Sequence, residues 1–146
     1  MDHVLGAVRA PGQPLEETYP YRHGIHDAPL TAPSGDFELH ASASARRQDM
    51  TTAFVVSHLA AGSPVGLVIQ VCQSLMQPDN GVVSFDPLVL PDQYHAVIGV
   101  GLGINLDTGE SFILVRNSWG GTWGVDGHAW LPFALLDILL VEGFLI

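Results

Sequence analysis

The spacing of apolar residues changes once along the chain, near residue 64. Between residues 46 and 62 they recur three or four positions apart, which predicts one helix over Arg46–Gly62. Asp49 is the expected N-cap, because its carboxylate can accept from the first free N–H groups, and Gly62 is the expected end. The preceding residues are rich in Pro, Gly, Ala and Ser and predict irregular, extended chain.

After Pro64 the pattern is that of β-strands. Val65–Val71 is apolar at nearly every position, which predicts a central strand buried on both faces. Other runs predict strands at Gly81–Phe85, Tyr94–Leu102, Phe112–Arg116, Ala129–Leu131 and the C-terminus, turns at Asn105–Gly109 and Val125–Gly127, and a helical turn at Pro132–Leu136. The expected fold is α+β, with one main helix packed on an antiparallel, partly closed β-barrel.

The same pattern divides the chain into two parts. Residues 1–48 are expected to form a long irregular segment that contains PLEETYPY at residues 14–21. Residues 49–146 are expected to form the helix and barrel domain. A chain of 146 residues is long enough to bury a core of its own.

Charge and composition narrow the classes of function. The chain has 15 acidic residues against five basic ones, all arginine, and a net charge of −10. It therefore lacks the basic surface that binds nucleic acid or anionic lipid. Its mean hydropathy of +0.29 is high for a small domain and favours an apolar face covered by a partner chain or a further domain. No apolar run is long enough to span a bilayer and no signal pattern begins the chain. The sequence thus leaves the compartment open, with the cytoplasm as the default.

Two residues could carry chemistry together. His95 and Asn117 stand 22 positions apart, on strands predicted to pair across a hairpin. An amide oxygen that accepts the imidazole N–H fixes the tautomer without adding charge, which suits a histidine whose partner is a thiolate. Trp119 would lie over that hydrogen bond and exclude water, and glycines at 120, 121 and 124 would let the backbone pass beneath the indoles. The residues alone still favour a structural histidine beside a Gly- and Trp-rich turn.

Two sequence motifs favour the catalytic interpretation of His95 over the structural one. The run NSWGGTWG at Asn117–Gly124 matches the asparagine motif of the papain-like cysteine peptidases at every fixed position, and HAVIGVG at residues 95–101 resembles their histidine motif. PLEETYPY, the helix, the Pro-Val pair at 64–65 and WLPFALL at residues 130–136 follow in the family's order. The chain therefore resembles the C-terminal half of a papain-like fold, the half that carries His and Asn on a β-barrel.

The resemblance implies a role for each matched residue. His95 is implied to be the general base and acid, and Asn117 its orienting partner. Trp119 and Trp123 are implied to shield that pair. The pocket that selects the substrate side chain is implied to be lined by three residues, Val68, Tyr94 and Ala96.

One motif that the resemblance implies, that of the nucleophile, is missing. The family's nucleophile lies in a Gln-Gly-x-Cys-Gly-Ser-Cys-Trp context at a helix N-terminus, which these 146 residues do not contain. The one cysteine, Cys72, ends the predicted central strand and is expected to be buried and structural, away from any helix N-terminus. Without a nucleophile and an oxyanion hole, His95 and Asn117 cannot form an acyl-enzyme by themselves.

Three functions are compatible with these observations. The first is a cysteine peptidase half-domain that is inactive alone and depends on a cysteine-bearing partner chain or missing half. The second is a non-catalytic papain-like module that binds a peptide or protein, and the third is an acyl-transfer role with a biosynthetic partner. The apolar composition predicts a homo-oligomer or heteromer. No cofactor and no metal site are expected, since His23 and His26 lack a further ligand pair.

Overall fold

The computed structural model describes residues 6, 9, 10, 12–15, 17, 38–41, 46–48 and 50–145. The chain divides into two compact units, Met1–Ala45 and Arg46–Ile146. In the first unit, β1 (Gln13–Pro14) pairs antiparallel with β2 (Leu39–His40). Most of PLEETYPY, together with His23 and His26, lies outside the described residues.

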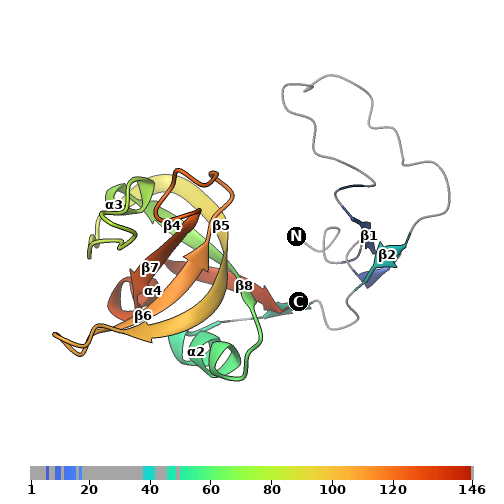
Figure 1. The fold of residues 1–146 in the computed structure, drawn as a ribbon, viewed down its shortest axis with the longest axis horizontal. Coiled ribbons are helices and arrows are strands. Elements are labelled where there is room, and N and C mark those ends of the chain that lie inside the picture. The colour runs from blue at the N-terminus through green and yellow to red at the C-terminus, as the bar shows by residue number, and fades with distance from the viewer. Residues whose placement is uncertain are drawn as a thin grey trace, which may run out of the picture. The chain divides into compact units, whose positions relative to one another are not determined.

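The second unit is built on one sheet in which every pair of neighbours is antiparallel (Figure 1). In spatial order its six strands are β3 (Arg46–Gln48), β8 (Leu140–Leu145), β4 (Val65–Cys72), β5 (Val89–Ile104), β6 (Ser111–Arg116) and β7 (His128–Pro132). The α+β class and the central place of the Val65 strand are confirmed. The sheet is not closed into a barrel, because among the described strands β3 and β7 remain its two edges.

The main helix, α2 (Thr52–Ala60), is shorter than the sequence predicts. Its N-cap is Thr51, whose hydroxyl accepts the N–H of Phe54 at 3.2 Å, and not Asp49. The helix ends as expected at Gly62, which has a φ of +79°. The predicted start at Arg46 is wrong, because residues 46–48 form β3 and pair with residues 143–145 of β8. Pairing with a strand almost 100 residues away thus overrides the local helical spacing.

Two other elements differ from the expectation. Gly81–Phe85 is not a strand: only Val82 forms isolated bridges, to Asp79 and Trp130. The preceding Asn80 has a φ of 48°, a turn conformation that interrupts an extended run. The short helix α3 (Gln73–Met76), which directly follows β4, was not predicted.

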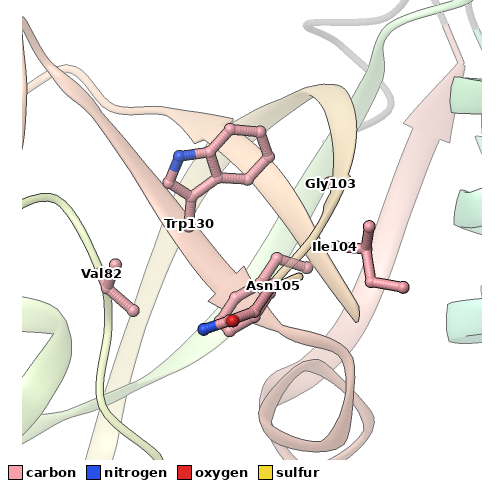
Figure 2. Close-up of a pocket in the computed structure, with 6 residues that line it drawn as sticks. Val82, Gly103, Ile104, Asn105 and Trp130 are labelled. Carbon is pink, nitrogen blue, oxygen red and sulfur yellow. The ribbon is translucent and has the colours of Figure 1, made fainter. Parts of the chain in front are cut away.

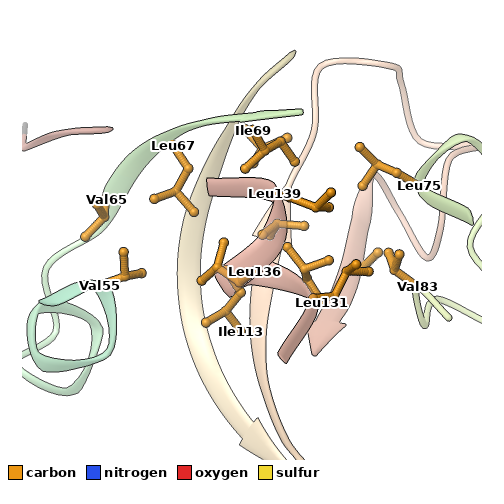
Figure 3. Packing of buried hydrophobic residues seen from close by; sticks show 14 of the residues in the cluster. Val55, Val65, Leu67, Ile69, Leu75, Val83, Ile113, Leu131, Leu136 and Leu139 are labelled. Carbon is orange, nitrogen blue, oxygen red and sulfur yellow. The ribbon is translucent and has the colours of Figure 1, made fainter. Parts of the chain in front are cut away.

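The hydrophobic core lies between the sheet and its helices. Figure 3 shows side chains from α2, β4, β6 and β7 meeting those of α4 (Phe133–Leu139). Leu67, Ile113 and Leu136 are completely buried, and each such side chain contributes about 1.5–3 kcal/mol relative to an exposed one. The hairpin turn at Asn105–Gly109 is confirmed by the Asn105 Oδ1, which accepts the N–H groups of residues 107 and 108 at 2.9 and 3.2 Å. This core fixes the two strands that carry His95 and Asn117.

Across the described residues, no helix has the length and apolar character that crossing a membrane requires.

Candidate active site

The β5–β6 hairpin brings the two motif residues together. His95 lies on β5 opposite Ile69 of β4, and Asn117 directly follows the last residue of β6. The β5–β6 ladder ends at the pair of Ile98 with Arg116. Beyond it the chain bends at Ser118 and Trp119, which brings the Asn117 side chain and the Trp119 ring to His95. The resulting distance from His95 Nε2 to Asn117 Oδ1 is 2.6 Å, a short hydrogen bond.

The contacts of Asn117 determine which imidazole nitrogen carries the proton. The backbone N–H of Ser118 can only donate, and it faces the same Asn117 oxygen at 2.7 Å. That atom is therefore the amide oxygen, an acceptor, so His95 Nε2 must donate to it. The neutral ring then has its lone pair on Nδ1, the nitrogen that faces away from Asn117. The arrangement makes Nδ1 the basic atom of His95.

Asn117 is buried, and its position leaves one polar atom unsatisfied. Only 9% of the residue is exposed, and its N–H donates to the carbonyl of Gly127 at 2.9 Å. Its side-chain Nδ2 is buried and has no hydrogen-bond partner among the described residues. An unsatisfied buried donor costs about 1–3 kcal/mol. The position of Asn117 thus satisfies its side-chain oxygen and leaves its side-chain nitrogen without a hydrogen bond among the described residues.

Two tryptophans support the histidine. Trp119 stacks on His95 with ring centroids 4.5 Å apart and planes inclined by 30°. Trp123 packs edge-on against Trp119 at 5.9 Å and does not stack on His95 itself. Its Nε1–H donates to the Leu75 carbonyl of α3 at 2.9 Å. The imidazole is therefore covered by an indole that a buried, hydrogen-bonded second indole holds in place.

The turn between β6 and β7 needs glycine at one point in particular. Gly124 has a φ of +58°, and a Cβ there would collide with the carbonyl of His128. By contrast, a Cβ at Gly121 would meet nothing within 4 Å. At Gly124 the close approach is to backbone, and at Gly120, as at Gly121, a Cβ would meet nothing within 4 Å. A Cβ at these three glycines would therefore not collide with an indole.

The three predicted pocket residues lie on one face of the sheet. Val68 pairs directly with Ala96, and Tyr94 lies two pairs away, opposite Gln70. This is the face opposite to His95, since side chains alternate along a strand. Tyr94 is 56% exposed, and neither of the two cavities described below includes these residues.

Sequence reasoning missed one charged neighbour of this patch. Glu142 of β8 pairs with Val68, so the row Glu142, Val68, Ala96 crosses three strands on one face. Nothing in the local sequence indicates this row, because it depends on the register between β4 and β8.

Cys72, the cysteine of the chain, ends β4, three residues beyond the Ile69 that pairs with His95. It is fully buried, and its Sγ lies 3.3 Å from the Ser74 hydroxyl. The expectation that it is not at a helix N-terminus is wrong, because Cys72 is the N-cap residue of α3. Its side chain makes no capping hydrogen bond there, however, and α3 has only four residues. In the described part of the chain, no group of three or more His, Cys, Asp or Glu side chains could hold a metal ion.

Comparison with known proteins identifies the family. The sequence profile described as papain family cysteine protease matches residues 1–133. The chain belongs to the papain family of cysteine proteases. Among papain-family relatives, cathepsin B-like CP3 of Giardia intestinalis is 28% identical over 123 residues, which cover 80% of this chain and 40% of that protein. Pro-cathepsin H of Bos taurus is 30% identical over 115 residues, covering 77% of this chain and 33% of that protein.

A solved cysteine protease structure shows the same fold. The crystal structure of xylellain, a cysteine protease from Xylella fastidiosa, matches with a TM-score of 0.67 and 20% identity, over 97% of this chain and 59% of that one. The matched region is partial in all these papain-family proteins. The chain spans between 18% and 40% of the length of the curated relatives it matches.

Proposed function

We propose that this chain supplies the general base of a cysteine peptidase site whose nucleophilic cysteine comes from polypeptide outside these residues. The observation that carries the proposal is the 2.6 Å hydrogen bond from His95 Nε2 to Asn117 Oδ1. It leaves the basic Nδ1 of His95 for a reacting group, which a purely structural histidine does not need. Membership of the papain family supports the assignment of that group as a thiol.

The proposed chemistry follows from this geometry. His95 Nδ1 takes the proton of the thiol, and the thiolate and imidazolium stabilise each other as an ion pair. The thiolate attacks the substrate carbonyl carbon, and Nδ1 returns the proton to the leaving amine as the C–N bond breaks. In the second half, Nδ1 takes a proton from water, which attacks the thioester and releases the thiolate. Throughout, Asn117 Oδ1 holds the Nε2–H, and the Trp119 ring limits access of water to that bond.

Burial of Cys72 supports the need for another polypeptide. A nucleophile must reach both His95 and the substrate, whereas Cys72 is fully buried. Papain-family relatives extend well beyond the matched region, since this chain spans 40% of the Giardia protein and 33% of the bovine one. We infer that the cysteine and the oxyanion-hole donors lie on a preceding segment of the same polypeptide or on a separate partner chain. The 146 residues alone are then inactive.

Burial of Cys72 equally favours a second function. A papain-like module that has lost catalysis would keep the fold and bind a peptide or protein without cleaving it. In that case, His95 and Asn117 would persist because they pack the turn between β6 and β7.

Activity measurements separate these proposals. The purified chain is assayed with a fluorogenic peptide mixture and an epoxide inhibitor, alone and after co-expression with a polypeptide that carries the Gln-Gly-x-Cys-Gly-Ser-Cys-Trp sequence. We expect activity and labelling of that cysteine only in the combined sample, with both abolished by His95→Ala. Activity of the chain alone would refute the proposed dependence on another polypeptide. A stable combined sample without activity or labelling would support the binding module.

A further inference from the structure

We propose that the outer face of β5, β6 and β7 is a docking site for an extended segment of a protein partner, with one bulky apolar side chain beside Lys or Arg. The site centres on Trp130 and lies apart from His95. Gly103, which lines it, stands eight residues along β5 from His95, which is about 26 Å measured along the strand at 3.3 Å per residue. The proposal therefore does not depend on the proposed peptidase function.

The first part of the site is a small apolar cavity of about 230 Å³. Its lining residues are Val82, Gly103, Ile104, Asn105, Phe112 and Trp130 (Figure 2). Sites for whole small molecules usually measure about 300–1,000 Å³, so this cavity suits one bulky side chain better than a complete ligand.

Trp130 joins this cavity to a second one on the same face. The second cavity measures about 490 Å³, and Leu114, Val125 and His128 are among its lining residues. Between the two, the indole lies directly over Gly103, where a Cβ would come within 2.6 Å of the ring. Both cavities border Trp130, so an extended segment that occupied both would pass over this ring; the two cavities together are called the groove below. Trp130 is half-buried, and tryptophan is among the residues that contribute most to protein interfaces.

The groove offers hydrogen-bond donors as well as apolar surface. The indole N–H of Trp130 makes no hydrogen bond within the described part of the chain, and neither does the side-chain NH₂ of Asn105. The Asn105 oxygen is already occupied by the turn N–H groups of residues 107 and 108. Both free groups are donors, so they match the backbone carbonyls of an extended segment.

Charge selects the kind of segment. Residues 50–145 carry eight carboxylates against a single arginine, Arg116, which pairs with His128 beside the second cavity. Asp107 and Glu110 lie in the hairpin beside Asn105, and Asp126 lines the second cavity. Such a surface attracts Lys and Arg, which can also lie over the face of Trp130. A second copy of this chain, with its net charge of −10, would be repelled.

A peptide-binding experiment tests the proposal. The probe is a fluorescein-labelled peptide, Lys-Ser-Phe-Ser-Arg, whose anisotropy is measured against the full chain. Two reference peptides replace Phe by Ala or both cations by Glu. We expect the probe to bind at low ionic strength at least about tenfold more tightly than either reference, and binding to weaken as salt is added.

Variants locate the binding. Val82→Arg places a cation in the groove at a residue that is 38% exposed, and Leu88→Arg adds the same charge at a residue that is 78% exposed and outside both cavities. We expect about a tenfold loss of affinity with the first and little change with the second. The pair Asp107→Asn and Glu110→Gln keeps the shape of the hairpin and should flatten the salt dependence. His95→Ala should leave binding unchanged.

Three results would overturn the proposal. These are no measurable binding of the probe, equal binding of the Phe and Ala peptides, or equal loss with Val82→Arg and Leu88→Arg. The last would mean that only the overall charge attracts the peptide. Because no peptide is cleaved in this assay, its failure would leave the peptidase proposal untouched.

Discussion

Replacing Asn117 by alanine should separate its role in positioning from its role in stability. The variant removes the acceptor for His95 Nε2 at 2.6 Å and for the Ser118 N–H at 2.7 Å. Two hydrogen bonds contribute about 0.5–1.5 kcal/mol each. Both donors can turn to water, because His95 is half-buried and Ser118 is exposed. The variant also removes the buried Nδ2 that has no partner among the described residues. Its removal should raise the free energy of unfolding by about 1–3 kcal/mol.

These opposing contributions nearly cancel. We expect Asn117→Ala to change the free energy of unfolding by no more than about 1 kcal/mol, measured by urea denaturation followed by circular dichroism. The imidazole should respond strongly, because nothing else in the described site holds its Nε2–H. Nitrogen-15 NMR of His95 should report a single Nε2–H tautomer in the parent chain and a mixture of tautomers in the variant.

The control is Asn117→Gln, which keeps an amide but moves its oxygen by one methylene. It should disturb the tautomer as alanine does. A loss of more than about 3 kcal/mol in Asn117→Ala, with the Nε2–H tautomer retained, would refute the reasoning. Asn117 would then be a structural residue, and something other than its oxygen would orient His95.

Three further predictions concern the fold around the site. Leu136→Ala, at a fully buried position, should lower the free energy of unfolding by about 2–5 kcal/mol in urea titrations. Ile138→Ala on the same helix, 40% exposed, should lower it by under about 1 kcal/mol, and equal losses would contradict the assigned core. Trp123→Phe removes the hydrogen bond to α3 and should lower the free energy of unfolding by about 1 kcal/mol or more. Near-UV circular dichroism should then show a less ordered Trp119, and an unchanged spectrum would refute the supporting role of Trp123. Gly124→Ala should destabilise the chain by about 1–3 kcal/mol, because of its positive φ and the nearby carbonyl, and Gly121→Ala should not; the thermal midpoints of the two variants provide the comparison.

The sequence predicts those parts of the site that depend on neighbours along the chain. His95 and Asn117 meet because one hairpin joins their strands, and its turn is encoded by the residues 105–109 that form it. Trp119, which stacks on His95, follows Asn117 by two residues in the same motif. For this reason the site geometry could be anticipated before the fold was known.

Features that depend on distant pairing could not be anticipated. Arg46–Gln48 falls in the range predicted as helix but pairs with β8 at the other end of the chain. The same strand places Glu142 opposite Val68, a contact with no local signal. The bond from Trp123 to the Leu75 carbonyl joins residues 48 positions apart. In each case, tertiary contacts decide between local structures of similar stability.

The hydrogen bond between His95 and Asn117 has a kinetic consequence. Because a single hairpin forms it, the base has its reactive nitrogen oriented before any thiol arrives. If the nucleophile lies on a separate chain, no slow rearrangement of the histidine need follow the encounter. On mixing, activity should then appear at a rate proportional to the concentration of the second chain, without a lag that is independent of concentration. The time course of reconstitution would thus measure the association rate of the two chains.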